Sequence, residues 1–223
     1  MQTHFEQELG ELKTRLLTMA SHAEASVTNA IKALVDRDDA LAQQVDQSDE
    51  ILDQFEIEID EMAIHLLAKA PLASDLRLIA VAMKISKNLE RVGDEATKIA
   101  RRARELNQEP QLKPYVDIPN MAKTALGMLK SALDSFVNRD PESARKIIPL
   151  DKEVDLLNKQ LHRELASYMV EKPSTISRCL NLMVISKSLE RIADHATNVA
   201  EDVVYFCEAL DIRHSGRKSG TAA

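Results

Sequence analysis

The sequence contains few of the residues that interrupt helices or favour strands. Its 223 residues include 5 Gly, 4 Phe, 3 Tyr and no Trp, whereas 29% are charged and 44% are hydrophobic. Ala, Leu, Glu and Lys favour helices, and aromatic residues favour strands. This composition predicts an all-α protein with a hydrophobic core.

Cysteines are equally scarce. Cys179 and Cys207 are the only two, which is too few for a disulfide framework, and they lack the spacing of a zinc site. We therefore expect free thiols in a reducing compartment and a cytoplasmic protein. The first residues are acidic and have no apolar core, so we expect no secretory signal peptide.

Long hydrophobic runs and an excess of positive charge are also missing. No stretch approaches the ~20 apolar residues that a membrane span needs, so we expect at most peripheral docking on a membrane complex. The formal net charge is −7, whereas nucleic-acid-binding proteins usually present a basic face. We therefore expect no nucleic acid among the partners.

Apolar residues recur every three or four positions through the first half of the chain. This spacing predicts a helix of about nine turns over residues 5–34. A second helix should follow over residues 38–69, capped by its first residue, an aspartate. Pro71 should end it, and a third helix should begin at Ser74 or Asp75.

The second half repeats this pattern after a segment with three prolines, residues 107–119, which predicts a linker. A shorter fourth helix is expected over residues 118–136. Asp140 and Pro141 are a typical N-cap and first residue for the fifth helix. Pro149 should interrupt that helix near its start, and Lys172-Pro173 should end it and open the sixth.

An internal repeat is the most informative feature of the sequence. Residues 87–100 read KNLERVGDEATKIA and residues 187–200 read KSLERIADHATNVA. A repeat of this length predicts two copies of one helical unit. We therefore predict two tandem three-helix bundles related by an internal pseudo-two-fold axis. The predicted boundaries are 1–107 for the first bundle, 108–119 for the linker, 120–210 for the second bundle and 211–223 for a disordered tail.

Carboxylates recur at helical spacing within both units. Glu90 and Asp94 are four residues apart, so they share one face of a helix. Asp49 and Asp53 form a similar pair on the preceding helix, and a hairpin around Pro71 would bring the two pairs to one height, ~27–35 Å from the turn. The second half repeats the geometry around Pro173. The predicted site residues are Asp49, Asp53, Glu90 and Asp94 in the first unit and Asp151, Asp155, Glu190 and Asp194 in the second.

Four converging carboxylates would repel one another unless a cation lay between them. Divalent and transition metal ions accept carboxylate oxygens, so the pattern predicts a metal site in each unit. The ion could be Mg²⁺, Mn²⁺, Zn²⁺ or Fe²⁺. A plain alternative is a solvated acidic face whose carboxylates pair with Lys87, Arg91 and Lys98.

Enzyme signatures are weak. A di-iron oxidase of the ferritin type needs Glu-x-x-His on paired helices, and no His lies three residues after these glutamates. His195 has Glu95 at the equivalent position, so it belongs to no repeated ligand set. The sequence also has no glycine-rich phosphate loop and no nucleophile elbow. We therefore expect no catalytic residues.

The repeated L-E-R-[VI]-[GA]-D-x-A-T, the Ala-Ser-Asp-Leu-Arg of residues 73–77 and the paired Asp-x-x-x-Asp segments resemble the PhoU family, from Phe5 to about Leu210. The resemblance implies tandem three-helix bundles whose acidic motifs hold metal ions, often as clusters. It further implies a cytoplasmic, often dimeric, non-catalytic repressor of the phosphate-starvation response. Such a protein would link the Pst phosphate ABC transporter, through its ATPase PstB, to the sensor histidine kinase PhoR.

Two local departures from the family pattern concern the second unit. Ala193 stands where the family usually has Gly, and Asp-Leu-Arg has no clean counterpart near Ser177. The second site is therefore expected to differ in tightness or in metal. The alternative to a regulatory adaptor is a helical metal-carboxylate enzyme or metal-storage protein, which would bind two irons close together and react with oxygen.

Overall fold

The computed structural model describes residues 4–70 and 72–213, and within these ranges every regular element is a helix. The helices are α1 (His4–Val35), α2 (Asp39–Gln47), α3 (Asp49–Leu67), α4 (Ala73–Asn107), α5 (Asp117–Asn138), α6 (Pro141–Ile147), α7 (Asp151–Glu171) and α8 (Ile176–Glu208), with 3₁₀ turns η1 (Ile148–Leu150) and η2 (Pro173–Thr175). The all-α prediction is confirmed. In the described part of the chain, no helix is long and apolar enough to cross a membrane. Most of the tail predicted to be disordered, residues 214–223, lies outside the described residues.

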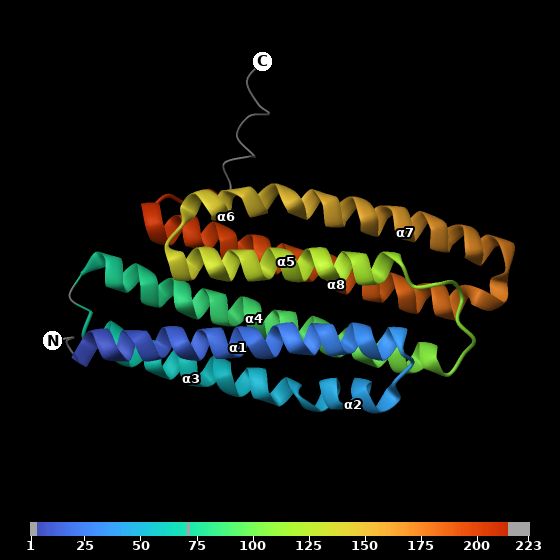
Figure 1. Cartoon of the computed structure of the whole chain (residues 1–223), viewed down its shortest axis with the longest axis horizontal. Coiled ribbons are helices and arrows are strands. Elements are labelled where there is room, and N and C mark those ends of the chain that lie inside the picture. The colour runs from blue at the N-terminus through green and yellow to red at the C-terminus, as the bar shows by residue number, and fades with distance from the viewer. Residues whose placement is uncertain (1–3, 71, 214–223) are drawn as a thin grey trace, which may run out of the picture.

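The helices pack as two bundles that follow one another along the chain. α1, the broken helix α2–α3 and α4 form the first, and α5, α6–α7 and α8 repeat that arrangement in the second. α4 and α8 lie next to each other in the middle of the molecule, with α3 along one edge and α7 along the other (Figure 1). The predicted tandem three-helix architecture is confirmed, with each middle helix broken near its start.

The apolar stripe of α1 lies in the core as its spacing predicts, and Leu12, Leu16 and Met19 are fully buried. The helix is followed by Arg37 in the left-handed conformation, with φ of 57°. The guanidinium of Arg37 donates to the backbone carbonyl of Asn107 at 2.5 Å, at the end of α4. The last carbonyls of a helix have no partner within it, so one side chain joins the ends of α1 and α4.

A break at Ser48 divides the helix that was predicted to run over residues 38–69. Asp38 caps α2 as expected, because its Oδ1 accepts the backbone N–H of Leu41 at 2.9 Å. Ser48 has ψ of −3°, and its hydroxyl donates to the carbonyl of Val45 at 2.9 Å. The prediction of one continuous helix is wrong here, because a serine side chain competes for the helix carbonyls without any proline to mark the break.

The other predicted helix signals fall close to the observed ends. Asp140 Oδ1 accepts the backbone N–H of Ser143 at 3.0 Å, and Pro141 is the first residue of α6. Pro149 lies in η1 and separates α6 from α7, as predicted. α4 begins at Ala73, one residue before the predicted start, without a side-chain cap.

The linker between α4 and α5 is held against the second bundle. Lys113 Nζ lies 2.8 Å from Asp117 and 2.6 Å from Glu164 on α7. Arg178 of α8 donates to the carbonyl of Pro110 at 2.9 Å. Because α5 begins at Asp117, the last three residues of the predicted linker form its first turn.

Polar contacts between α4 and α8 follow the pseudo-two-fold symmetry. Arg191 donates to Glu95 at 3.2 Å, and His195, the repeat equivalent of Glu95, hydrogen-bonds to Asn88 at 2.9 Å. Arg91, the equivalent of Arg191, contributes to the lowered pKa of His195, although burial is the main cause. Arg191 thus lies near Glu95 and its equivalent Arg91 lies near His195, so the contacts repeat with the two halves exchanged, as in an isologous interface.

A small residue allows the helices that carry the acidic pairs to approach closely. A Cβ added to Gly93 of α4 would overlap the Cδ1 atom of Leu52 on α3. In the second bundle the equivalent positions hold Ala193 and Val154, both fully buried. The extra methyl of Ala193 is therefore matched by a shorter side chain on the facing helix, which accounts for the departure from Gly at this position.

We predict that Gly93 and Leu52 are energetically coupled. Gly93→Ala overpacks the contact, although Ala favours the helix by ~1 kcal/mol, and Leu52→Val leaves a gap that costs about 0.5–1.5 kcal/mol. The double variant copies the second bundle and should be more stable than the sum of the singles by at least ~0.5 kcal/mol, measured by urea unfolding. Additive effects would show that the two side chains do not determine this helix spacing.

Candidate metal sites

The first acidic cluster brings together carboxylates from α3 and α4. Burial raises the pKa of Asp49 most, and the Asp94 and Asp53 carboxylates raise it further, against a hydrogen bond with Thr97. Burial and then repulsion from Asp94 also raise the pKa of Glu90. Asp49 and Asp94 come from facing helices and repel each other, so the structure brings the two predicted pairs together.

The second cluster repeats this arrangement between α7 and α8. Burial, followed by repulsion from Asp155 and Glu190, raises the pKa of Asp151. Burial, followed by repulsion from Glu190 and Asp151, raises the pKa of Asp194 to about 6. All four predicted residues of the second unit therefore interact, although Asp194 keeps contact with solvent.

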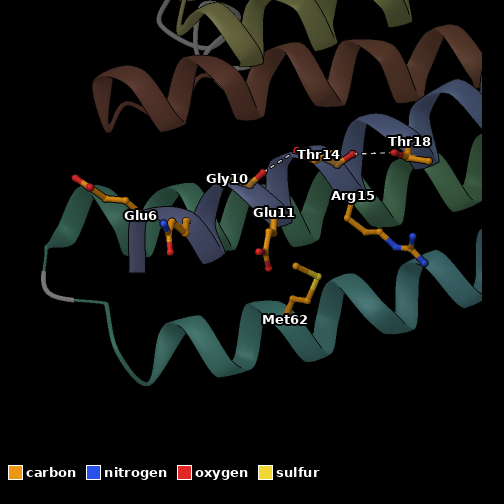
Figure 2. A pocket seen from close by; sticks show the side chains of 8 residues that line it. Glu6, Gly10, Glu11, Thr14, Arg15, Thr18 and Met62 are labelled. Atoms are coloured by element: carbon orange, nitrogen blue, oxygen red, sulfur yellow. Dashed lines mark hydrogen bonds between the residues drawn. The ribbon is translucent and has the colours of Figure 1, made fainter. Parts of the chain in front are cut away.

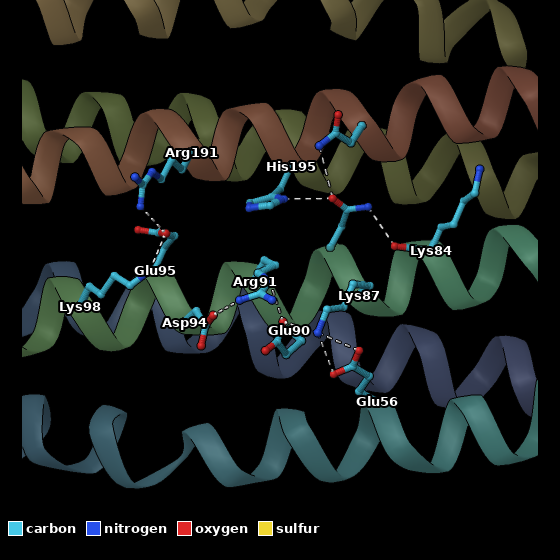
Figure 3. A network of polar contacts seen from close by, with 12 residues as sticks. Glu56, Lys84, Lys87, Glu90, Arg91, Asp94, Glu95, Lys98, Arg191 and His195 are labelled. Carbon is cyan, nitrogen blue, oxygen red and sulfur yellow. Dashed lines mark hydrogen bonds and ion pairs between the residues drawn. The ribbon is translucent and has the colours of Figure 1, made fainter. Parts of the chain in front are cut away.

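Lysine and arginine side chains offset part of the charge in the first cluster. Lys87 Nζ lies 3.3 Å from Glu90 Oε2, and Arg91 Nη1 donates to Asp94 at 2.9 Å, as Figure 3 shows. Lys98 points instead to the buried Glu95, at 2.8 Å. Of the three basic residues that were expected to pair with the acidic face, Lys87 and Arg91 do so, whereas Lys98 pairs with Glu95 outside the predicted site.

The second cluster contains a buried oxygen that these pairs do not satisfy. Lys187 pairs with Glu190, and Lys159 Nζ lies 3.5 Å from Asp155. Asp151 Oδ1 is buried and has no hydrogen-bond partner. A buried acceptor without a partner is unfavourable, and a hard cation would satisfy it.

The donor set suits an oxygen-preferring cation, but the side chains are not arranged around a single point. Among residues 4–70 and 72–213, no three His, Cys, Asp or Glu side chains are placed to hold one ion. Binding would thus require the carboxylates to change rotamer and to exchange Lys87, Arg91 or Lys187 for the ion. The eight carboxylates stay a prediction as ligands.

Sequence analysis missed the polar seam between α4 and α8. Glu95 is only 4% exposed. Burial disfavours its charge, but hydrogen bonds with Lys98 and Ser188 outweigh that effect and lower its pKa. Glu95 and His195 differ at equivalent positions of an otherwise similar repeat, and this difference was the available signal.

An open groove between α1 and α3 lies outside the acidic clusters (Figure 2). Glu11, Arg15 and Thr18 of α1 and Met62 of α3 line it. Arg15 forms an ion pair with Glu58 and lies over the ring of Phe55, 4.2 Å from the centroid. These contacts join α1 to α3, and none of the eight predicted site residues lines the groove.

Comparisons with known proteins give a consistent answer over nearly the whole chain. A family model described as PhoU domain matches residues 16–103 and 118–203. A Pseudomonas putida protein named phosphate-specific transport system accessory protein PhoU homolog is 43% identical over 220 residues, covering 98% of this chain and 86% of that protein. The Escherichia coli K12 protein named phosphate-specific transport system accessory protein PhoU is 35% identical over 213 residues, covering 95% and 88%.

Solved structures agree with this similarity. The crystal structure of PhoU from Pseudomonas aeruginosa superimposes with a TM-score of 0.89 at 42% identity, covering 93% of this chain and all of that one (100%). The phosphate transport system regulatory protein PhoU from Streptococcus pneumoniae gives a TM-score of 0.88 at 27% identity, covering 94% and 99%. The two matched PhoU regions correspond to the two bundles.

We predict that the metal-free protein becomes more stable as the pH falls from about 7.5 to 5.5. Asp194 has a folded-state pKa of about 6, above its ordinary value of 3.8. The folded state therefore holds the proton more tightly, and this stabilisation is lost as the pH rises through about 6. The check is the melting temperature against pH in the presence of a chelator.

Asp194→Asn should flatten this pH dependence. The matched control is Glu153→Gln, which removes one exposed carboxylate from α7 and should leave the wild-type profile unchanged. Equal profiles for Asp194→Asn and wild type would contradict the coupling of Asp194 to its neighbours.

Proposed function

The chain belongs to the PhoU family, and on this premise we propose that it is an accessory protein of a phosphate-specific transport system that represses the phosphate-starvation response when phosphate is plentiful. The observation that carries the proposal is similarity to accessory proteins of that system over 98% and 95% of the chain. These relatives are named as accessory or regulatory proteins, not as enzymes. The alternative of a metal-carboxylate enzyme finds no specific support.

The proposed partners are the transporter ATPase PstB and the sensor kinase PhoR. An adaptor of this kind would act at the cytoplasmic side of the membrane, docked on the transporter without crossing the bilayer, and as a homodimer. A rigid scaffold of long helices suits this role, because it can present separate surfaces to two partners at fixed positions.

We further propose that metal ions bind the two acidic clusters. The carboxylates of Asp49, Asp53, Glu90 and Asp94 would hold metal between α3 and α4, and those of Asp151, Asp155, Glu190 and Asp194 would hold it between α7 and α8. Raised carboxyl pKa values and the unsatisfied Asp151 oxygen support this proposal. A divalent ion would supply the positive charge that the carboxylates lack. The acidic side chains would then hold the facing helices at a fixed distance.

Metal should raise the melting temperature of the wild-type protein. Binding only to the folded state stabilises it by about 2.7 kcal/mol when free metal is a hundredfold above its dissociation constant. Mg²⁺, Mn²⁺, Zn²⁺ and Fe²⁺ should be tested on wild type and on Glu90→Gln plus Asp94→Asn, which keeps the shape and removes the charge. The variant should respond less, and without metal it should be at least as stable as wild type.

Glu11→Gln plus Glu171→Gln is the matched control, because it removes two exposed charges far from the clusters. It should respond to metal as wild type does. An equal metal response in all three proteins would reject the first cluster as a metal site and favour a purely structural role for the motif.

Deleting the gene should raise alkaline phosphatase and phosphate-transporter expression in phosphate-rich medium. A reporter for the phosphate regulon measures this, and wild-type protein supplied in trans should restore repression. Pull-down of PstB and PhoR from cells grown in high and low phosphate tests the partners. Full repression in the deletion strain would overturn the regulatory assignment, provided that the genome carries no second copy.

A further inference from the structure

The polar seam between α4 and α8 holds two cations around one buried carboxylate. Lys98 Nζ donates to Glu95 Oε1 at 2.8 Å, and Arg191 Nη1 donates to the same oxygen at 3.2 Å. In the described part of the chain, neither cation forms a second ion pair. The side chains of Lys98 and Arg191 are 45% and 50% exposed, whereas that of Glu95 is 6% exposed. The solvent side of this cluster is therefore positively charged.

Both cations keep hydrogen-bond donors that Glu95 does not use. A lysine ammonium has three N–H donors and an arginine guanidinium has five, and the side chains of Lys98 and Arg191 each donate one hydrogen bond within the described residues. Lys98 belongs to α4 and Arg191 to α8, and Figure 3 shows both side chains directed toward Glu95. The remaining donors are thus available to a ligand that lies across the two bundles.

Glu95 keeps one oxygen without a partner. Its Oε2 atom is buried and has no hydrogen bond of normal geometry. The Ser188 hydroxyl lies close enough to help to lower the pKa of this carboxylate, but it does not satisfy Oε2. A buried acceptor without a donor is unfavourable. A ligand that brings its own O–H group to the seam would supply the missing donor.

The equivalent half of the seam lacks this arrangement, because neutral residues replace both the carboxylate and the lysine. These residues are His195 and Asn198. Burial is the main cause of the lowered pKa of His195, which keeps the imidazole uncharged near pH 7. The remaining cation of that half, Arg91, donates to Asp94 at 2.9 Å. One site per chain is therefore expected.

We propose that the seam binds a small tetrahedral oxyanion that carries a proton, of the hydrogen phosphate class. The guanidinium of Arg191 and the ammonium of Lys98 bind two of its oxygens, because both groups form strong charge-assisted hydrogen bonds with phosphate. The unpartnered oxygen of Glu95 accepts the O–H of the ligand. Since the two cations come from different bundles, the bound oxyanion links α4 to α8.

The carboxylate of Glu95 gives the site its selectivity. Sulfate has the size and shape of phosphate, but it carries no proton at neutral pH. Its oxygens would therefore face the negative charge of Glu95 without a hydrogen between them. A site built around a hydrogen bond from its ligand rejects an analogue that lacks the donor.

Arg91 connects this site with the proposed metal clusters. Arg91 Nη1 donates to Asp94, and Arg91 Nε lies 3.4 Å from Glu90 Oε2. A metal ion on these two carboxylates would release Arg91 and add a third cation beside the oxyanion. This coupling rests on the proposed metal binding, whereas the oxyanion site itself does not. Coupling between two bound ligands is reciprocal, so phosphate should also tighten the binding of metal.

Isothermal titration calorimetry with inorganic phosphate tests the site on protein that has been stripped of metal with a chelator and then dialysed. One site per chain is expected, with a dissociation constant of about 1 mM or lower. Sulfate should bind at least ~10-fold more weakly than phosphate. The sodium chloride concentration is kept constant, because salt screens exposed charges.

Three variants separate the contributions. Arg191→Gln should weaken phosphate binding by about tenfold or more. Glu95→Gln keeps the shape of the side chain and removes the charge that repels sulfate, so it should reduce the preference for phosphate to less than ~3-fold. The matched control, Arg91→Gln, removes the equivalent arginine and should leave metal-free phosphate binding within about twofold of wild type. Circular dichroism and melting curves establish that each variant is folded.

The same titrations with saturating Mg²⁺ test the coupling. Wild type should bind phosphate at least ~5-fold more tightly than without Mg²⁺, and Arg91→Gln should lose this gain. Phosphate held directly by the metal would survive Arg191→Gln, and that result would overturn the coupling. If Mg²⁺ alone does not bind, the metal proposal fails, while the metal-free titrations still decide the oxyanion site.

Three results would overturn the oxyanion site. The first is no binding of phosphate to folded, metal-free wild type up to ~10 mM, about tenfold above the expected dissociation constant. The second is equal affinity for phosphate and sulfate, which would indicate a general attraction of anions to exposed cations. The third is unchanged phosphate binding by Arg191→Gln, which would leave Lys98, Glu95 and Arg191 as a structural ion pair between the bundles.

Discussion

The close approach of α4 to α3, and of α8 to α7, is the constraint on which the acidic sites depend. Gly93 lies directly against Leu52, and each of the two pairs of carboxylates flanks this contact on its own helix. Burial is the main cause of the raised pKa of Asp49, and a larger spacing would separate Asp49 from Asp94 and remove the repulsion that raises this pKa further. Core packing and the charge of the site are therefore set by the same contact.

The repeat has kept its core and changed its surfaces. Ala193 and Val154 together replace Gly93 and Leu52, which preserves the fit of the facing helices while altering both members. At the seam between the bundles, Glu95 corresponds to His195, and each has acquired partners on the other half. On the exposed sides of α3 and α7, two equivalent positions differ in the sign of their charge, since Glu50 corresponds to Lys152 and Glu61 corresponds to Arg163.

Each acidic cluster holds more negative than positive charge, which connects its structure with the proposed metal binding. Lys87, Arg91 and Lys187 reach only some of the carboxylates, and the Asp151 oxygen is left without a partner. Carboxylates that lie close together in both halves repel one another, and this repulsion disfavours the folded state when no cation offsets it. A cation bound by the same carboxylates would offset their repulsion and link the two helices.

The sequence alone was sufficient to predict the helices, the repeat and the caps at Asp38 and Asp140. It also predicted that the acidic pairs on facing helices lie at the same height along the bundle. These features depend on residues that are near in the chain or related by a constant offset, so spacing and local hydrogen bonding decide them. Only the tertiary structure decided the pairing of Arg191 with Glu95, the raised pKa of Asp194 and the edge positions of α3 and α7. Those depend on through-space contacts and on burial, often between residues about 100 positions apart, and no local pattern in the sequence records them.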